Sequence, residues 1–425
     1  MQEISINDLY EVTLALDNDG YKLLSIKNGI VTYAKGKEIL EVRLYDDMNH
    51  VTKTLRPNYD NSLLTIDASI RKFFGKRPNY KTNETVDELL SSGRYKHVVL
   101  MLLDGLGSAQ INDNLAEDAF LKKHKVKDIS AIFPSTTTAA ITALESGKEP
   151  LETGWLGWDT YVKELDKHIV LFKDSDYFTG EKLDFNAYEY LKYSKFYQNM
   201  TEHLFKVTTK DIDKVNGATS FKEACSKVLT GIKSCETSFT YMYWNEPDYT
   251  MHEYGSASKE AKIVIKDIND ELKRFKEAIT DDTLVIITSD HGHIDCNPIY
   301  LYNFTGITDT FQRVPSNEGR ATFFKIRPFA KGTFVRRFKR YFGSYFRLMT
   351  KYEFIVNGYL GKNILKTNPK LLNLIGDYVA IATKNYYFNY DPRVLSKADD
   401  TFTFKSHHAG LTENEMVLPL IIIKK

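Results

Sequence analysis

The sequence predicts an α/β fold with a mainly parallel central sheet flanked by helices, and two observations carry this prediction. Short continuous apolar runs, which are typical of strands buried on both faces of a parallel sheet, recur along the 425 residues. Amphipathic helix-like stretches such as 257–280 lie between them, and this alternation is typical of the fold class. The four runs are HVVLMLLDG (97–105), FTYMYW (239–244), LVIITSDHG (284–292) and LPLIIIKK (418–425).

The runs and the segments between them also predict a domain organisation. A chain of this length holds two or three domain-sized units, or one large core with insertions. We expect the core of the fold in residues 96–298 and 400–425, because these segments contain the four apolar runs. Residues 1–95 are expected to form an α+β extension, and residues 299–399 an inserted cap region rich in Phe, Tyr, Lys and Arg.

Composition and charge narrow the class of protein. Hydrophobic residues make up 42% and charged residues 27% of the chain, which is ordinary for a globular protein, and the formal net charge is +1. This charge produces no strong field toward nucleic acid or membrane. The N-terminus lacks a secretory pattern, no apolar run is long enough to span a bilayer, and three cysteines form no recognisable framework. We therefore expect a cytoplasmic protein without a membrane partner.

Polar side chains follow three of the four apolar runs. Asp104 follows the first run, residues 245–248 follow the second, and Asp290 and His291 follow the third. Ligands of open α/β sheets bind beyond the carboxyl ends of the strands, so the fold would bring these residues together. Two further motifs are FPSTTTAAITALESG (133–147) and SHHAGLTENEMVLPL (406–420).

These motifs contain the side chains of a two-metal site. Carboxylates and imidazoles together suit zinc, and also manganese. Six such ligands exceed the need of one tetrahedral ion and would serve two ions, which can clamp the attacking and leaving oxygens of a displacement at phosphorus. A threonine hydroxyl activated by metal coordination would be the nucleophile. The six ligands are Asp104, Asp248, Asp290, His252, His291 and His408.

Each motif also has a simpler structural interpretation. An Asp after a strand is more often a turn or helix-capping residue, and Asp248 with His252 has the spacing of a surface helix pair. The FPSTTT segment has the composition of a helix start. His293 is read only as a residue that supports a metal ligand or as a surface residue. The occurrence of all the motifs at strand ends of one chain favours the catalytic interpretation.

In order and spacing, these motifs resemble the alkaline phosphatase superfamily, and most closely its nucleotide pyrophosphatase/phosphodiesterase branch, the type I phosphodiesterases. The resemblance covers roughly residues 96–295 and 400–425. The family's late His falls on His408, with Ala409 replacing the first Gly of its turn and His407 as the alternative. The family's other metal ligands fall on Asp104, Asp248, His252, Asp290 and His291.

The resemblance also implies a nucleophile and a mechanism. In the family, Gly, Pro and Gly follow the nucleophile ten, thirteen and seventeen residues later, a spacing that Gly147, Pro150 and Gly154 match for Thr137. One metal would bind Asp248, His252 and His408, and the other Asp104, Asp290, His291 and the Thr137 oxygen. Attack by Thr137 and hydrolysis of the phospho-threonine by water would cleave a small phosphate ester or nucleotide-like substrate.

Alternatives remain within and outside this family. Ala140 and Thr138 replace an Asn and an aromatic residue that serve nucleotide binding in many members, so a phosphomonoesterase or phosphonate hydrolase is an alternative. A sulfatase or phosphomutase is less compatible with a threonine nucleophile. The basic and aromatic segment 333–351 has the composition of a polyanion-binding surface, although we favour an amphipathic cap helix and do not expect nucleic acid as a partner.

Overall fold

The central feature of the computed structural model, which describes residues 2–27, 30–44, 53–199 and 203–425, is a six-stranded sheet. Its strand order is β10-β11-β5-β12-β21-β6, and only β21 runs antiparallel to its neighbours. The predicted α/β class with a mostly parallel central sheet is therefore confirmed. The bounds are β10 His203–Val207, β11 Ser238–Trp244, β5 His97–Leu103, β12 Thr283–Thr288, β21 Val417–Ile423 and β6 Lys125–Ser130.

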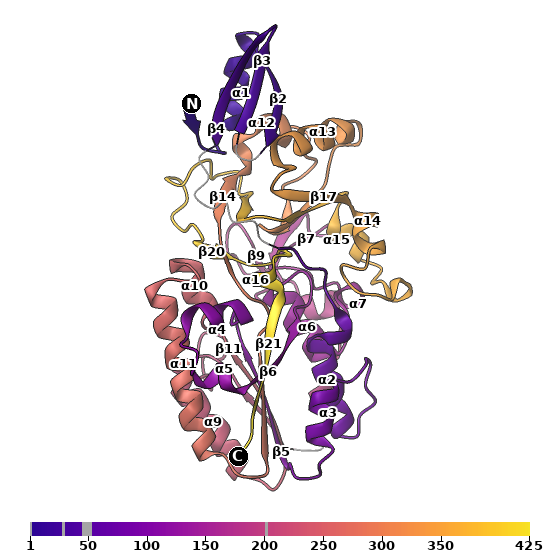
Figure 1. The fold of residues 1–425 in the computed structure, drawn as a ribbon. Helices are drawn as coiled ribbons and strands as arrows, with labels where there is room; N and C mark the ends of the chain where they lie inside the picture. The colour runs from indigo at the N-terminus through magenta and orange to yellow at the C-terminus, as the bar shows by residue number, and fades with distance from the viewer. Residues whose placement is uncertain (1, 28–29, 45–52, 200–202) are drawn as a thin grey trace.

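Helices cover both faces of this sheet (Figure 1). All seven residues of β5 are buried, and alternate side chains pack into separate cores, with Val98 and Leu100 on one face and Val99 and Met101 on the other. Apolar surface is thus removed from water on both faces, which stabilises the sheet. One face is covered by α2 (Leu63–Phe73), α3 (Glu84–Leu90) and α6 (Thr137–Ser146); the other by α4 (Ser108–Asn114), α5 (Phe120–His124), α9 (Phe221–Lys233) and α11 (Lys259–Ala278).

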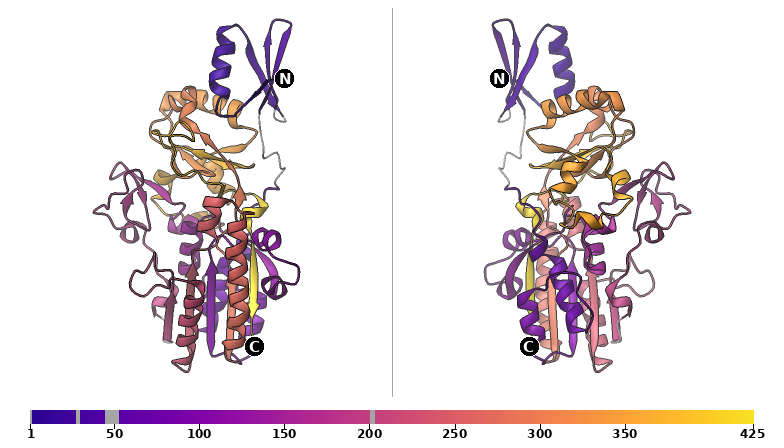
Figure 2. Two further views of the ribbon diagram at one scale, coloured as in Figure 1. Left: turned by 90° about the vertical axis from the view of Figure 1, so that its left-hand side faces the viewer. Right: turned by 90° about the vertical axis from the view of Figure 1, so that its right-hand side faces the viewer.

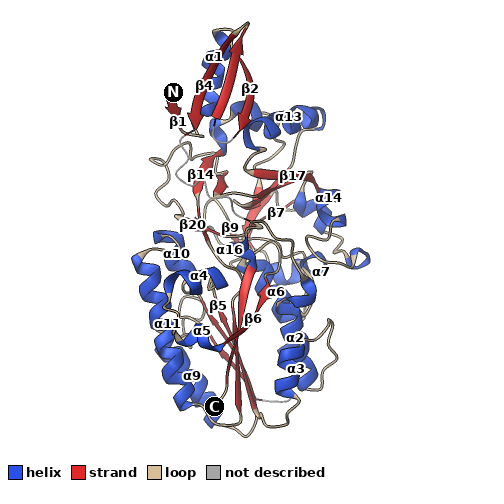
Figure 3. Cartoon of the chain, viewed as in Figure 1, coloured by secondary structure: helices blue, strands red, loops and turns tan. Residues whose placement is uncertain are grey.

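A second, antiparallel sheet lies beyond one end of the central sheet (Figure 3). It joins two segments that are distant in the sequence, 159–176 and 316–382, because β15 pairs with β7. The interval expected to form a cap therefore shares its sheet with part of the interval assigned to the core. The strands, in order, are β17 (Phe346–Thr350), β18 (Tyr378–Ala382), β16 (Ala321–Phe324), β15 (Ser316–Glu318), β7 (Asp159–Val162), β8 (Lys167–Val170) and β9 (Ser175–Asp176).

Short two-stranded pairs and helices accompany the antiparallel sheet, and we call the sheet and these elements together the antiparallel tier. The pair β13 with β20 connects it to the central sheet, and β14 pairs with β19 nearby. The bounds are β13 Ile294–Asp295, β20 Ser406–His407, β14 Asn297–Tyr300, β19 Tyr386–Asn389, α12 Thr305–Thr308, α13 Lys331–Phe342, α14 Lys351–Val356 and α15 Leu371–Ile375.

The N-terminal residues form a small unit at the far end of the molecule (Figure 2). Its four-stranded sheet has the order β1-β4-β3-β2, and its helix contributes Tyr10, whose ring lies against Phe304 and Tyr341. The unit therefore packs on α12 and α13. In contrast, α2 and α3 follow within the predicted extension but pack on the central sheet. The bounds are β1 Gln2–Ile4, α1 Leu9–Asn18, β2 Lys22–Lys27, β3 Ile30–Lys35 and β4 Glu38–Leu44.

Helix α13 contains most of the basic and aromatic segment singled out in the sequence. Its rings at Phe334, Phe338 and Phe342 are fully buried, whereas Arg337 and Arg340 donate hydrogen bonds to the carbonyls of Gly306 and Leu23. The aromatic side chains are core residues and do not form a stacking surface for bases. Among the described helices, none combines the length and the apolar character that a bilayer crossing requires.

A buried ion pair links the antiparallel sheet to the core. Arg320, between β15 and β16, is fully buried and donates two hydrogen bonds to Glu415, at 2.7 and 2.8 Å. Glu415 lies in α16 (Glu413–Met416), just before β21, and also accepts from the backbone N–H groups of Gly410 and Thr412. The pair therefore fixes the turn that follows His408.

Removing one partner of this pair should strongly destabilise the protein. We expect Arg320→Met to lower the free energy of unfolding by about 3 kcal/mol, because Glu415 would stay buried without its counter-charge. The matched control is Arg393→Met, whose exposed pair with Asp391 should contribute less than about 1 kcal/mol. Urea unfolding measures both, and equal effects of the two variants would contradict the assignment.

Candidate active site

Polar residues converge beyond the carboxyl ends of the central strands. Asp104 follows β5, Asp290 and His291 follow β12, and α10 (Asp248–Tyr254) begins shortly after β11. Because Asp248 and His252 are one helical turn apart, α10 presents both to the same place. Close approach of these segments requires Gly105, where a Cβ would lie 3.0 Å from Asp248 and from the His293 ring, and where φ is +73°.

One group of ligands comprises Asp104, Asp290 and His291, whose ligand atoms all lie within 4.8 Å of one another. His291 Nε2 is 3.2 Å from Asp104 Oδ1, 3.5 Å from Asp290 Oδ2 and 3.2 Å from the hydroxyl oxygen of Thr137. Thr137 is the first residue of α6 and is half-buried. The four residues that the sequence assigned to one metal therefore lie together.

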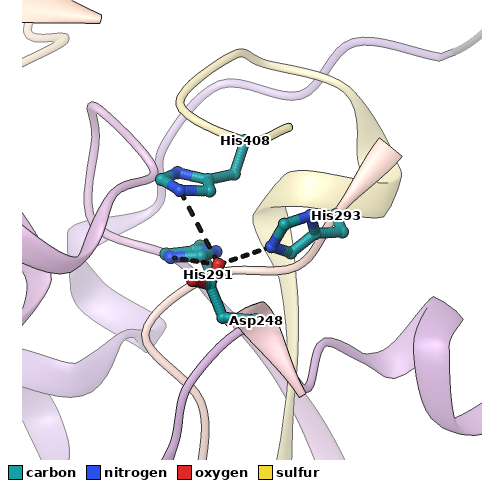
Figure 4. Close-up of side chains that lie close together, drawn as sticks. All are labelled: Asp248, His291, His293 and His408. Carbon is teal, nitrogen blue, oxygen red and sulfur yellow. Dashed lines mark hydrogen bonds and ion pairs between the residues drawn. The ribbon is translucent and has the colours of Figure 1, made fainter. Parts of the chain in front are cut away.

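The second group surrounds Asp248 (Figure 4). Its Oδ1 is 3.4 Å from His252 Nε2 and 3.8 Å from the Nε2 atoms of His291 and His408. The nearest imidazole is His293, whose Nε2 lies 2.5 Å from the same oxygen. The structure thus brings the three sequence-assigned ligands together and adds His293, which is fully buried in this site and is neither a surface residue nor remote from the ligands.

The imidazoles of this site are oriented by hydrogen bonds at Nδ1. His252, His291 and His408 direct Nδ1 at the carbonyl oxygens of Ser406, Gly292 and Ser135, which accept only. Each Nδ1 must therefore carry the hydrogen, and each neutral ring presents the lone pair of Nε2 to the site. This orientation by an outer partner is the arrangement found around metal-binding histidines.

His293 is oriented in the same way by a side chain. The Ser406 hydroxyl donates to the carbonyl of Met251, at 2.8 Å, so its oxygen accepts from His293 Nδ1, also at 2.8 Å. Nε2 of the neutral ring then carries a lone pair directed at the Asp248 carboxylate. The 2.5 Å contact between this nitrogen and the Asp248 oxygen therefore needs positive charge shared between them, as a proton in a hydrogen bond or as a metal ion.

The pKa values of the site also indicate that positive charge is needed among these side chains. Burial, followed by the neighbouring carboxylates Asp290 and Asp248, raises the pKa of Asp104 well above its usual value. Burial lowers the pKa of His293 to about 4 and holds that of His408 well below its usual value, so both rings are neutral. For His291, burial acts to lower the pKa, but Asp290 and Asp104 raise it to about 10. A positive charge is therefore favoured at His291 Nε2.

Two buried carboxylate oxygens complete the test for metals. Within the described residues, Asp104 Oδ1 and Asp290 Oδ2 have no hydrogen-bond partner. Buried carboxylate oxygens that accept no hydrogen bond are costly unless positive charge lies beside them, and these two atoms belong to the ligand group around His291. The donor set of carboxylate oxygens and imidazole nitrogens therefore fits a site for two divalent ions.

His407, the alternative to His408 in the sequence, differs in its hydrogen bonding. Its Nδ1 accepts from the backbone N–H of His408, at 2.9 Å. The neutral ring then carries its hydrogen on Nε2 and has no lone pair free for a metal. Although His407 lies within 4.8 Å of His252 and His408, this tautomer favours His408 as the ligand.

A large cavity opens beside the ligands. Its volume is about 1080 Å³, and its lining includes Asp104, Thr137 and Asp248 of the core together with Glu318, Tyr390 and Phe404. Residues 317–319 and 387–404 contribute to its walls, so part of the interval 299–399 covers the site. The buried Arg320 and the exposed Lys405 are not among the residues that line it.

Comparison with known proteins agrees with this geometry. The family model of the type I phosphodiesterases/nucleotide pyrophosphatases matches residues 98–393, which is more than half of the chain. The chain belongs to this family of hydrolases, and the resemblance found in the motifs is confirmed.

Curated relatives match over shorter segments. Mouse bis(5'-adenosyl)-triphosphatase enpp4 is 32% identical over 114 residues, which cover 25% of each chain. The human protein of the same name is 32% identical over 102 residues, 22% of each chain, and rat ectonucleotide pyrophosphatase/phosphodiesterase family member 7 is 31% identical over 84 residues, 19% of each. The matches therefore span a quarter or less of the relatives' length.

Solved structures share the fold at low identity. Murine ectonucleotide pyrophosphatase/phosphodiesterase 5, as an inactive variant in complex with AMP, has a TM-score of 0.56 at 16% identity, covering 76% of this chain and 87% of the other. Phosphonoacetate hydrolase of Sinorhizobium meliloti 1021 has a TM-score of 0.55 at 14% identity, covering 78% and 90%. These similarities show the fold alone.

We expect the chain to bind two divalent ions and His293 to contribute to the affinity for one of them. The variant His293→Asn should weaken binding of that ion at least about tenfold, because a nitrogen facing Asp248 is lost. Competition with a chromogenic chelator, together with elemental analysis, measures affinity and stoichiometry. The control His203→Asn, at an exposed histidine of β10, should retain both ions with unchanged affinity. Unaltered binding by His293→Asn would exclude His293 from the metal site.

Proposed function

We propose that the protein is a two-metal phosphodiesterase or nucleotide pyrophosphatase that works through a phospho-threonine at Thr137. The observation that carries the proposal is the contact of 3.2 Å between the Thr137 hydroxyl and His291 Nε2, within the group that also contains Asp104 and Asp290. The hydroxyl lies where an ion bound by this group would be in reach of its oxygen. A cytoplasmic location stays a prediction.

The neighbouring threonines support the assignment to Thr137. Thr136 is buried and donates its hydroxyl hydrogen to Glu318, at 2.8 Å. Thr138 is also buried, and its hydroxyl oxygen is away from both solvent and hydrogen-bond partners among the described residues. Thr136 and Thr137 both line the cavity, but of the three hydroxyls it is that of Thr137 that contacts a candidate metal ligand.

The ligand groups would hold two ions, zinc or alternatively manganese. Asp104, Asp290, His291 and Thr137 would hold one, and Asp248, His252 and His408, with His293 beside them, the other. Such ions neutralise the phosphate oxygens and favour the alkoxide form of a bound hydroxyl. The chain itself positions Thr137 at the start of α6, where backbone N–H groups of the first turn favour a phosphate group.

The surroundings of Thr137 favour diesters over monoesters. Residues 133–147 contain no Arg or Lys that would meet the second negative charge of a monoester. A diester carries one charge, and its second substituent needs space, which a cavity of about 1080 Å³ provides. The names of the curated relatives and the AMP bound to a structural relative support a nucleotide-like substrate, whereas Ala140 and Thr138 depart from the residues that many nucleotide-cleaving members use.

The role of Thr137 is tested by substitution. We expect Thr137→Ala to lower turnover of bis-(p-nitrophenyl) phosphate by at least about a thousandfold, since the attacking oxygen is removed while the other ligands remain. The matched controls Thr136→Ala and Thr138→Ala should keep far more activity. Rapid acid quenching of the wild-type reaction should trap a phosphorylated Thr137 peptide by mass spectrometry. Loss of activity confined to Thr136→Ala would show that Thr136, and not Thr137, is the nucleophile.

The preference for diesters is tested by a ratio of catalytic efficiencies. With the same metal and pH, kcat/KM for bis-(p-nitrophenyl) phosphate should exceed that for p-nitrophenyl phosphate, because the second charge of the monoester meets no cation near Thr137. A ratio well below one would favour the phosphomonoesterase alternative.

A further inference from the structure

The cavity extends from Thr137 along one face of α6. Thr137, Ile141 and Glu145 are spaced by four residues, so they share a face of the helix, and all three line the cavity. Eight residues of helix span about 12 Å, so Glu145 is about that far from the nucleophile along the helix axis. We call this part of the cavity the inner arm; its walls include Thr137, Ile141, Glu145, Lys195, Lys206 and Tyr241.

Strand β11 forms another wall of the inner arm and leads in the same direction. The Tyr243 hydroxyl donates to Asp104 in the metal site, and Tyr241 lies two residues earlier on the same face of the strand, about 7 Å farther from the metal site. Tyr241 is only 7% exposed, and its hydroxyl has no hydrogen-bond partner among the described residues. A buried hydroxyl without a partner is costly, so it is a candidate for contact with a ligand.

The carboxylate of the inner arm is already neutralised. Glu145 is 2.7 Å from Lys195 Nζ, and it accepts hydrogen bonds from the hydroxyls of Tyr193, at 2.9 Å, and Tyr197. Three donors therefore satisfy this carboxylate from within the protein. A cationic ligand would find Glu145 occupied and Lys195 beside it.

A second lysine leaves the inner arm with a positive charge. Lys206 of β10 is the register partner of Tyr241 in the adjacent parallel strand, so both side chains lie on the same face. Within the described part of the chain, Lys206 contacts the Tyr197 ring, with Nζ 4.5 Å from its centre, and forms no ion pair. Among the six residues named as walls of the inner arm, two ammonium groups therefore outnumber one carboxylate, and the next carboxylate along the chain in the cavity lining is Asp211, beyond the end of β10.

We propose that the inner arm binds the second substituent of the substrate, and that this substituent ends in an anionic group, a carboxylate or phosphate, received by Lys206 and the Tyr241 hydroxyl. This inference rests on the proposed phosphodiesterase function and specifies its substrate class. Ile141 lies between the nucleophile and the charged end, so the intervening part of the substituent meets an apolar side chain. The ligand would supply the hydrogen-bond acceptor that Tyr241 lacks.

The test uses p-nitrophenyl phosphodiesters whose second ester is an alkyl chain ending in a carboxylate. The matched substrates are the methyl esters of the same chains, and the chain length is increased stepwise. We expect the metal-loaded enzyme to prefer the carboxylate by about tenfold in kcat/KM, mainly through KM, once the chain spans the inner arm. A third series ending in phosphate determines which of the two anions binds better.

Variants assign the preference to residues. In Lys206→Met the ratio of carboxylate to methyl ester should fall to about one, and Tyr241→Phe should lower it by a smaller factor. The control Lys192→Met, at an exposed lysine near Lys195, should keep the wild-type ratio. Each ratio compares two substrates with the same variant. Partial unfolding lowers both kcat/KM values by the same factor, so it does not change the ratio.

The outcomes separate this inference from the proposed function. If no diester is cleaved, the phosphodiesterase proposal fails. If diesters are cleaved but the ratio is about one at every chain length, or if Lys206→Met keeps the preference, the anionic subsite is overturned and the phosphodiesterase proposal stands.

Discussion

Three carboxylates brought together around one imidazole are the constraint on which this site depends. Asp104 and Asp290 are buried, and Asp248 is largely so, within reach of the same His291 nitrogen. Burial and the neighbouring carboxylates disfavour the ionised form of Asp104, so added positive charge stabilises the arrangement. Protons or divalent ions can supply it, and the orientation of the imidazoles leaves Nε2 lone pairs that suit the ions. The ligand geometry and the chemistry are therefore two consequences of one electrostatic requirement.

The fold meets this requirement by using rigid elements. Strands β5, β11 and β12 are parallel and adjacent, so their carboxyl ends deliver three carboxylates to one edge. The last candidate ligand, His408, lies before a turn that the Arg320–Glu415 pair holds between the two sheets. The cavity walls come from the antiparallel tier as well as from α6, β10 and β11, and many of these wall residues are separate from those that would bind metal. Such a separation allows the walls to change while the ligands stay fixed.

The sequence predicted the parts of the site that depend on local pattern. The apolar runs gave the strands that end at Asp104 and Asp290, and the spacing from Thr137 to Gly147 matched a helix that begins at the former and is capped by the latter. His293 has no metal-binding role in the sequence-based assignment, although it lies two residues after His291. Its orientation depends on Ser406, 113 residues away, and a sequence does not show which nitrogen of a ring carries the hydrogen. The pairing of β7 with β15 was also missed, because antiparallel pairing between distant segments has no local signature.

Ser406 orients two imidazoles of this site, and this shared role has a consequence for how such proteins diverge. Its carbonyl orients His252 and its hydroxyl orients His293, so one residue that binds no ion controls two that face Asp248. Replacement by alanine would retain the carbonyl and remove the hydroxyl, freeing one ring to exchange tautomers while the other stays fixed. A lineage could therefore adjust which metal it loads, or how tightly, through a single substitution outside the ligand set. Differences in metal preference among relatives therefore need not come from substitutions of the ligand residues themselves.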